Sequence, residues 1–385
     1  MLLATLGWDD YFSRQFESLE RDGLVPARIV EQHKSGYTAY GEQAEWQADV
    51  TGRYLHVLAG LVGFPSVGDW VGLQPVPNED RALIYALLRR RTQFVRKVAG
   101  SGIEEQVVAS NVDVVFLVTG LDGNFNLRRI ERYLTEAWSS GAQPVVLLNK
   151  ADLCDDVATC IRAVESVAPG SAVHAVSAAR NEGVDVVRGY LTPGRTIAFL
   201  GSSGVGKSTI INRLLGEDRQ EVQSVSNAVG KGRHTTTSRS LLLHPDGGMI
   251  IDMPGMRELQ LWASEGDVEQ SFMDIELLAG RCRFKDCTHT TEPGCGVLAA
   301  LNNGSLDEDR YRNYMKLQKE VRRLQHFQKL REHTRGGGDL SRVRDTGQIP
   351  QRIREPVRGR RDFGSGSIVD RDEEWHMGKR ARDAS

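Results

Sequence analysis

The sequence lacks any long hydrophobic run. Within its 385 residues no apolar stretch approaches the ~20 residues that a membrane-spanning helix needs. It also lacks a secretory signal and any visible internal repeat. These absences argue against a membrane protein, a secreted protein and a repeat array. We therefore expect a cytoplasmic protein that does not enter a membrane and is long enough for two or three separate cores.

Cysteine is scarce, and three of the five cysteines gather around one histidine. Cys282, Cys287, His289 and Cys295 have the spacing C-x4-C-x-H-x5-C within fourteen residues. Three thiolates and an imidazole are the ligand set of a closed structural zinc site. Disulfide pairing is the alternative, and a reducing compartment disfavours it. All four ligands come from the protein, so the predicted Zn²⁺ stabilises the fold and does no chemistry.

An excess of charge of either sign is also missing, because the formal net charge is only −2. The charges are nevertheless distributed unevenly. From Arg281 to the end there are 23 Lys and Arg against 16 Asp and Glu, or +7, which leaves −9 for residues 1–280. The basic terminal third suggests an acidic partner, RNA first, although charged helices are often simply solvated.

A phosphate-binding loop is present. Residues 201–208 read GSSGVGKS and fit G-x-x-x-x-G-K-[ST], between an apolar strand predicted at 196–200 and a helix predicted at 208–215. The glycines let backbone N–H groups face phosphate oxygens, Lys207 reaches the β and γ phosphates, and Ser208 ligates Mg²⁺. A chance match lacks this flanking strand and helix. The predicted nucleotide-binding residues of the loop are Gly201, Ser202, Ser203, Gly204, Val205, Gly206, Lys207, Ser208 and Thr209.

A second motif predicts recognition of guanine. Asn149, Lys150, Ala151 and Asp152 form NKxD after the apolar run 144–148, which suits a strand buried on both faces. The carboxylate at position 152 can accept hydrogen bonds from the ring N–H and the exocyclic amine of guanine, an arrangement that adenine does not offer. This specificity argues against an ATPase or a nucleotide kinase. We expect the Asn and Lys side chains to brace the pocket.

A second predicted strand ends in Ser177 and Ala178, a pair that matches the guanine-base loop following NKxD in GTPases. Both of these guanine motifs precede the phosphate loop, which reverses the usual order. Loops that meet at one edge of a parallel sheet can follow one another along the chain in any permuted order. The sequence therefore predicts a circularly permuted GTPase.

Two further segments match the switch regions of GTPases. Residues 249–255 form a strand that delivers Asp252 to the second shell of Mg²⁺ and Gly255 to the γ-phosphate, as in D-x-x-G. Residues 230–237, GKGRHTTT, suggest a loop in which Thr235 or Thr236 closes over Mg²⁺, and the motif does not decide between the two. An exposed loop is the alternative.

The sequence lacks a glutamine after D-x-x-G, where many GTPases orient the attacking water; Met256 stands there. We therefore expect slow unassisted turnover. His234 is the nearest group that could position water, and a role in shaping the loop or contacting a partner is an equal alternative. The predicted catalytic set is Lys207, His234, Thr235 and Thr236.

The flanking regions differ in pattern from the GTPase region. Short alternating runs at 27–31, 37–40, 46–50 and 69–73 predict a small all-β barrel. In an OB-fold, Tyr37, Tyr40 and Trp46 could stack on RNA, although barrel aromatics are more often core. Residues 307–333 have a helical pattern, and the Gly-rich, charged residues after 334 predict a disordered tail.

Together the ordered motifs NKAD, SA, GSSGVGKS, GRHTTT and DMPG, followed by the cysteine cluster, resemble the ribosome small-subunit-dependent GTPase family, RsgA (also YjeQ or YloQ). Residues 111–116 and 126–134 also look like that family. The resemblance implies an α/β protein: a circularly permuted P-loop GTPase domain with a mostly parallel sheet, flanked by an OB-fold barrel and a zinc-binding helical domain. The expected parts are an extension at 1–21, an RNA-binding OB-fold at 22–100, the GTPase domain at 101–280, the zinc domain at 281–333 and a disordered tail at 334–385.

The resemblance also implies a partner and an activity. It implies docking on the small (30S) ribosomal subunit during late maturation, contact with 16S rRNA, and slow hydrolysis of GTP to GDP that this subunit accelerates. The alternative is an RNA-binding assembly module in which GTP is a structural ligand and hydrolysis is incidental. Intact Lys207, Ser208 and Asp252 argue against it. We expect a monomer.

Overall fold

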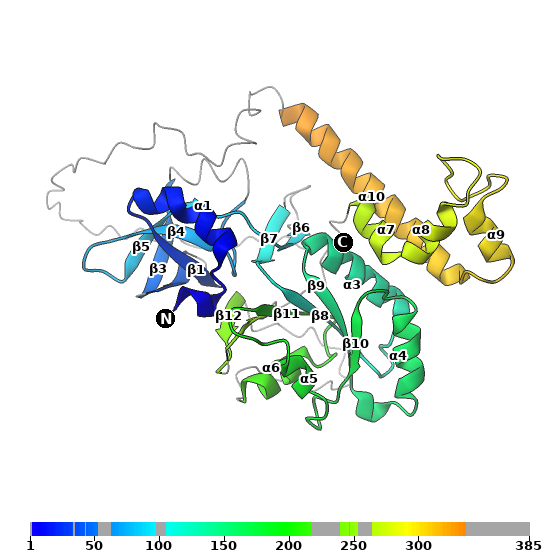
Figure 1. The fold of residues 1–385 in the computed structure, drawn as a ribbon, viewed down its shortest axis with the longest axis horizontal. Helices are drawn as coiled ribbons and strands as arrows, with labels where there is room; N and C mark the ends of the chain where they lie inside the picture. Colours follow the sequence, from blue (N-terminus) through cyan, green and yellow to red (C-terminus); the bar gives the residue numbers. More distant parts are fainter. Residues whose placement is uncertain are drawn as a thin grey trace, which may run out of the picture. The chain divides into compact units, whose positions relative to one another are not determined.

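The computed structural model describes residues 2–33, 35–42, 44–52, 63–97, 105–216, 239–245, 247–252 and 264–335 (Figure 1). Residues 1–330 form one compact unit. Across these described ranges, no helix is both long enough and apolar enough to span a bilayer.

The first part is a five-stranded barrel, as the alternating runs predict. Its strands are β1 (Val25–Gln32), β2 (Tyr37–Gly41), β3 (Glu45–Val50), β4 (Trp70–Pro75) and β5 (Arg81–Leu87). They pair in the order β1-β2-β3-β5-β4, and pairing between β4 and β1 closes the barrel. In β5 every second residue is buried, because one face of each barrel strand points inward.

The aromatic side chains proposed for RNA stacking contribute to packing. Tyr37 is buried in the barrel core, while Tyr40 and Trp46 are half-buried and pack against core clusters. Their surroundings therefore favour a role in packing the barrel over a role in stacking on RNA.

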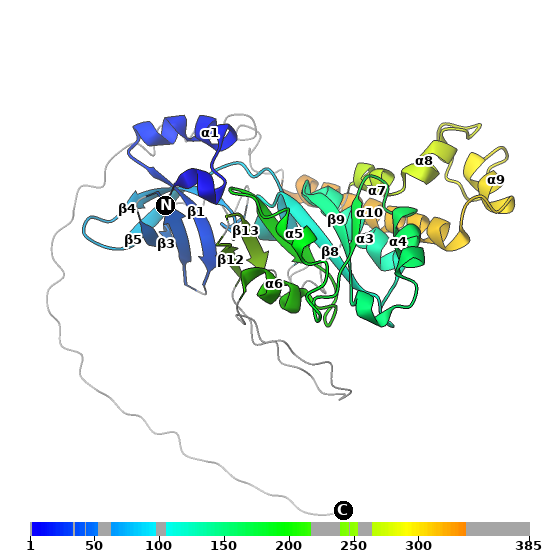
Figure 2. The same ribbon diagram turned by 60° about the horizontal axis from the view of Figure 1, so that its bottom comes forward.

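The N-terminal residues cover one side of the barrel. They form η1 (Leu3–Leu6) and α1 (Asp10–Arg21), and the Asp9 side chain caps α1 by accepting from the Tyr11 N–H at 3.0 Å. Trp8 meets Trp70 of β4 edge to face with ring centroids 4.7 Å apart, and α1 lies beside β1 and β4 (Figure 2). The segment 1–21 thus shares the barrel's hydrophobic core.

The central part is a six-stranded, mostly parallel sheet with the order β10-β9-β8-β11-β13-β12. Only β12 runs antiparallel to its neighbour in this set, and its other edge pairs with β1 of the barrel. The runs expected at 144–148 and 196–200 are strands, as predicted, and the run expected at 249–255 is a strand over its described residues, 249–252. The strands are β8 (Val114–Gly120), β9 (Gln143–Asn149), β10 (Ala172–Ala175), β11 (Thr196–Leu200), β12 (Arg239–Leu243) and β13 (Met249–Asp252).

Helices cover both faces of this sheet (Figure 1). Because side chains alternate along β8, Val115 and Leu117 join the core under α3 (Leu127–Ser140) and α4 (Val157–Glu165). Their neighbours on the opposite face join the core under α5 (Asp185–Arg188) and α6 (Lys207–Leu215). The sheet is therefore buried on both sides, which accounts for the continuous apolar runs of its strands.

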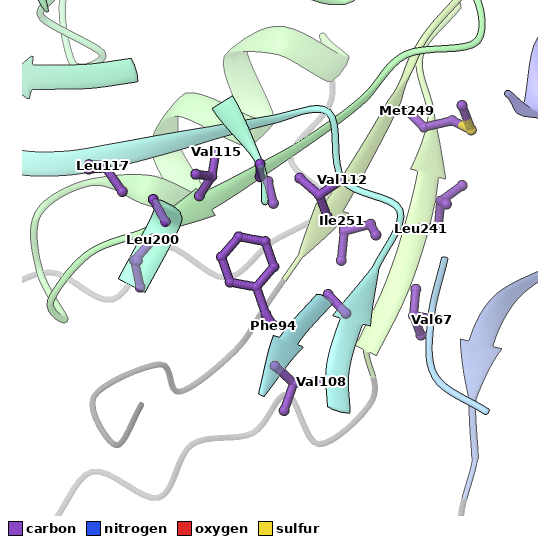
Figure 3. Close-up of a cluster of buried hydrophobic side chains, with 14 of the residues drawn as sticks. Val67, Phe94, Val108, Val112, Val115, Leu117, Leu200, Leu241, Met249 and Ile251 are labelled. Atoms are coloured by element: carbon purple, nitrogen blue, oxygen red, sulfur yellow. The ribbon is translucent and has the colours of Figure 1, made fainter. Parts of the chain in front are cut away.

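A hairpin made of β6 (Gln93–Lys97) and β7 (Glu105–Ser110) precedes the sheet. Phe94 and Val108 pack into the same cluster as Leu200 and Ile251 of the central sheet (Figure 3). The expected boundary at residue 100 consequently falls between the two strands of one hairpin.

A buried arginine joins the barrel to the sheet. The guanidinium of Arg28 in β1 donates to the carbonyls of Leu6, Gly68 and Asn111, the last at 3.0 Å, and is 1% exposed. Burial lowers its pKa to about 10, although Asp113 and Asp69 oppose this shift. Three carbonyls replace the water that this cation would otherwise bind.

The C-terminal part is helical and contains the Cys and His residues of the predicted metal site. Its elements are α7 (Glu265–Ser271), α8 (Met273–Ala279), α9 (Gly296–Asn302) and α10 (Glu308–Arg335), the last being the helix predicted at 307–333. Phe272, Ile275, Val297, Tyr314 and Leu317 are among its core residues.

Candidate functional site

The phosphate loop connects β11 to α6, as the motif predicts. Gly204 and Gly206 have φ values of +78° and +97°, which side chains rarely tolerate. A Cβ on Gly206 would lie 2.2 Å from Asn149 Nδ2, and one on Gly201 would lie 2.3 Å from the Val118 carbonyl oxygen. Glycine is required here because the loop passes this close to neighbouring strands.

The polar side chain of Lys207 folds back onto the loop. Lys207 Nζ donates to the carbonyl oxygens of Gly201 at 2.7 Å and Ser202 at 2.9 Å. Ser203 and Gly204 are exposed, Val205 is buried, and Ser208 and Thr209 lie in the first turn of α6 with partial exposure. The N-terminus of α6 offers backbone N–H groups and a positive dipole end to an anion.

Asn149 joins the three motifs that the sequence separates. Its side-chain Nδ2 donates to the Val205 carbonyl at 2.8 Å, and its Oδ1 accepts from the Ala178 N–H at 3.0 Å. One buried amide thus ties the NKAD segment to the phosphate loop and to the Ser-Ala loop. The role of Asn149 in bracing the guanine pocket stays a prediction.

Asp152 is held as an ionised acceptor. The Ser177 hydroxyl donates to its Oδ1 at 2.6 Å, and Arg180 Nε lies 3.8 Å from its Oδ2. The Ser177 hydrogen bond is the largest cause that holds the pKa of Asp152 below its usual range. A backbone hydrogen bond and then the charges of Arg180 and Lys150 add to it, while desolvation opposes them. The residue lies in η2 (Ala151–Leu153), whose Ala151 N–H donates to the Val176 carbonyl at 3.1 Å.

Lys150 has a partner that the sequence analysis missed. Its Nζ donates to Asp122 Oδ2 at 2.6 Å, and the residue adopts a left-handed φ of +62°. Burial raises the pKa of Asp122, but the Lys150 and Asn124 hydrogen bonds outweigh it and lower the pKa overall. Asp122 lies two residues after the end of β8, and a polar residue just after a buried parallel strand could have suggested this position.

Asp252 ends β13, the neighbour of the phosphate-loop strand β11, and is partly buried. The remaining residues predicted for the switch regions are Gly255, Met256, His234, Thr235 and Thr236, and all of them lie outside the described residues.

The predicted metal ligands converge in the C-terminal part. Their ligand atoms all lie within 4.8 Å of one another. His289 Nδ1 is 3.5 Å from the sulfur of Cys282 and 3.5 Å from that of Cys295, and the two sulfurs are 3.8 Å apart. A tetrahedral Zn²⁺ with bonds of about 2.3 Å to sulfur and about 2.0 Å to nitrogen separates its ligands by roughly 3.5 to 3.8 Å. The Cys₃His cluster, completed by Cys287, therefore fits zinc.

The surroundings of the cluster shift the pKa values of its members in different directions, and burial raises the pKa of the Cys287 thiol to about 11. The Gly296 N–H donates to Cys282 Sγ at 3.3 Å, and backbone donors lower the pKa of this thiol although burial, the largest effect, raises it. Burial lowers the pKa of His289, which favours the neutral imidazole. The Tyr311 hydroxyl donates to the His289 carbonyl at 2.6 Å and helps to fix that ligand.

The remaining cysteines do not join the cluster. Cys154 and Cys160 lie near α4 with sulfurs 3.9 Å apart, and both are free thiols.

A base-recognition loop that precedes the phosphate loop along the chain, on a mostly parallel sheet, defines a circularly permuted GTPase. A family model described as RsgA GTPase matches residues 87–262. The "Small ribosomal subunit biogenesis GTPase RsgA" of Opitutus terrae is 49% identical over 329 residues, covering 83% of this chain and 90% of its own. The protein named "RsgA 2" of Lactiplantibacillus plantarum is 45% identical over 80% of this chain and 86% of its own. The chain therefore belongs to the RsgA family of small ribosomal subunit biogenesis GTPases.

Solved structures support the same fold. The crystal structure of YjeQ from Thermotoga maritima aligns with a TM-score of 0.58 at 28% identity, covering 77% of this chain and 98% of that one. YloQ, described as a circularly permuted GTPase, aligns with a TM-score of 0.55 at 21% identity over 78% of this chain and 95% of its own. The α/β architecture, with an N-terminal barrel, a permuted GTPase domain and a C-terminal Cys₃His cluster with helices, is thereby confirmed.

Proposed function

We propose that this GTPase is a ribosome-triggered switch in the late maturation of the 30S subunit, slow by itself and accelerated by that subunit. The observation that carries the proposal is the bridge made by Asn149 between the phosphate loop and the Ser-Ala loop, next to an ionised Asp152. This arrangement can bind a guanine base and its phosphates at the same time. The relatives are named for the small ribosomal subunit, so we take this subunit as the candidate trigger of hydrolysis.

Individual roles follow from these positions. Lys207 would contact the β and γ phosphates, Ser208 would ligate Mg²⁺, and Asp252 would contribute to the second shell of this ion. When bound, Mg²⁺ neutralises the charge shared by the β and γ phosphates. We assign Gly255 to the γ-phosphate, Thr235 or Thr236 to the closure over the metal ion, and His234 to the attacking water or to the loop itself.

The proposal also includes a zinc ion, contact with rRNA, and the location and oligomeric state of the protein. One structural Zn²⁺ would bind the Cys₃His cluster, because its four ligand atoms lie within 4.8 Å of one another and those of Cys282, His289 and Cys295 have nearly tetrahedral spacing. Contact with 16S rRNA is supported by the +7 charge from Arg281 onward. We propose a cytoplasmic monomer, since the free thiols suit a reducing compartment where ribosomal subunits mature.

The decisive experiment measures GTP hydrolysis by the purified protein with and without small ribosomal subunits. Lys207→Ala serves as the blank, because it removes the cation that contacts the phosphates. A large stimulation that is absent from the blank supports the switch. Slow turnover that the subunit does not change, together with tight GTP binding, favours the alternative of an RNA-binding assembly module in which hydrolysis is incidental.

A further inference from the structure

Arg129 lies beside the phosphate loop, although none of the predicted nucleotide-binding motifs includes it. It occupies the first turn of α3, where the Asn126 side chain caps the helix by accepting from the Arg129 N–H at 3.1 Å. Its guanidinium Nη1 lies 3.4 Å from Ser202 Oγ and 3.4 Å from the Asn124 carbonyl oxygen. The side chain is half-buried. A cation from another helix thus reaches the second residue of the phosphate loop.

Arg129 differs from the neighbouring arginines of α3 in the groups that it contacts. Its neighbours Arg128 and Arg132 each pair with two carboxylates. Arg129 contacts only neutral oxygens: among the residues that the structure describes, no carboxylate oxygen lies within 4.0 Å of its guanidinium. A half-buried positive charge without a paired anion favours the binding of an anion next to it. GTP, with about four negative charges, is the anion that the adjacent loop is built to bind.

The turn that carries Arg129 is fixed from its other side. Glu131 is fully buried and accepts from Arg310 Nη1 at 2.7 Å and from Asn313 Nδ2 at 2.5 Å, both on α10. Within the phosphate loop, Ser202 is held through its carbonyl by Lys207 and through its hydroxyl by Arg129. Two cations therefore hold the same residue from different elements, which limits the movement of the loop.

We propose that Arg129 is a positioning residue for GTP hydrolysis: it holds the phosphate loop through the Ser202 hydroxyl and adds a positive charge to the triphosphate site. The inference rests on the GTP binding proposed above. The charge of Arg129 should affect GTP hydrolysis more than GDP binding. Only GTP carries the γ-phosphate, whose negative charge is redistributed during phosphoryl transfer.

The test is single-turnover hydrolysis of saturating GTP by the full-length protein, with GDP affinity and melting temperature measured on the same samples. Arg129→Met should slow turnover about 10-fold, equivalent to ~1.4 kcal/mol. GDP affinity should stay within about 3-fold, because GDP lacks the γ-phosphate. Arg129→Lys should retain at least about one third of the rate because it keeps the charge, although not the planar fork.

Two further variants make the test specific. Ser202→Ala should slow turnover about 3-fold, and the double variant should be no slower than Arg129→Met alone, because both changes remove one contact. Arg188→Met is the control, since this exposed arginine pairs with Asp185 on α5. Its rate should equal that of the unchanged protein.

Three results would overturn the inference. The first is an unchanged hydrolysis rate in Arg129→Met. The second is an equal loss of rate in the Lys and Met variants. The third is a fall of both melting temperature and GDP affinity in Arg129→Met while its rate at saturating GTP is preserved. If the unchanged protein itself fails to bind or hydrolyse GTP, the proposed function fails instead.

Discussion

At the scale of single residues, Asp152 determines which base the site can accept. Its carboxylate is held by Ser177 and remains ionised, so it can accept from two N–H groups of guanine. We predict that Asp152→Asn shifts preference from guanine toward xanthine nucleotides, because the new amide can donate to the xanthine carbonyl. Loss of a charged hydrogen bond should weaken GDP binding by about 10- to 100-fold. Competition between GDP and xanthosine diphosphate measures this.

Asp155→Asn is the matched control for that experiment. It removes an exposed carboxylate three residues further along the chain, and base preference should not change. Unchanged preference in Asp152→Asn itself would contradict the assignment of the base-recognition residue.

Glu136 makes the stability of the protein depend on pH. Burial raises its pKa to about 8, against the opposing charge of Arg132, and its Oε2 is buried without a hydrogen bond among the described residues. The pKa of Glu136 is higher in the folded protein than in the unfolded chain. The contribution of this group to stability is therefore complete below pH ~4.5 and is lost as the pH rises through 8, because the unfolded chain releases the proton first.

We therefore predict that Glu136→Gln flattens this dependence. Between pH 6 and 8 the unchanged protein should lose about 1 kcal/mol per pH unit relative to the variant. Urea unfolding at several pH values measures the difference. Glu165→Gln, at an exposed carboxylate, should retain the original slope, and an equal slope in the Glu136 variant would refute the prediction.

At the scale of elements, a buried ion pair contributes to the contact between α3 and α10, beside the pair of Arg132 with Glu320. Arg310 is 5% exposed and donates to Glu131 and to Asp274 of α8. Removing Arg310 leaves the buried Glu131 carboxylate with Arg128 and Asn313 as its described partners, and losing one partner of a buried ion pair costs about 3 to 5 kcal/mol in comparable cases. We predict that Arg310→Met destabilises the protein by about 3 kcal/mol and that adding Glu131→Gln restores part of the loss.

Urea unfolding of both single variants and the double variant gives the coupling energy. Arg312→Met is the control, because Arg312 and Glu308 form an exposed pair on the same helix. It should change stability by less than about 0.5 kcal/mol. Strictly additive losses in the double variant would show that the two buried residues do not depend on each other.

At the scale of the whole molecule, the metal cluster and the nucleotide site are connected by two routes. Asp252 precedes Cys282 by 30 residues along the chain, and α3 contacts both the phosphate loop and α10. A change at the γ-phosphate can thereby reach the C-terminal part. We predict that Cys282→Ser loses the bound zinc and removes the nucleotide dependence of small-subunit affinity, while GDP binding persists.

Metal analysis and sedimentation with small ribosomal subunits test this prediction. Cys154→Ser should retain one zinc per chain and the nucleotide dependence, because its sulfur lies outside the cluster. If Cys282→Ser loses the zinc and still binds the subunit in a nucleotide-dependent manner, the proposed coupling is wrong.

The sequence by itself determined the features that depend on local spacing. The glycines and Lys207 of the phosphate loop, the NKAD segment and the cysteine cluster each lie within a few residues, so their chemistry is visible without coordinates. Apolar runs likewise predicted β9, β11 and β13, because strands buried on both faces are continuously hydrophobic. The reversed motif order already indicated circular permutation.

Only the tertiary structure decided the contacts between distant residues. The pairs Lys150 with Asp122, Arg129 with Ser202 and Arg310 with Glu131 are separated by 28, 73 and 179 residues. No periodicity marks such pairs, because a charged side chain on a helix has the same pattern whether it meets water or a buried partner. The same reason separates Tyr37 in the barrel core from an RNA-stacking aromatic: burial depends on what the fold places against a side chain, and the sequence around it does not contain that information.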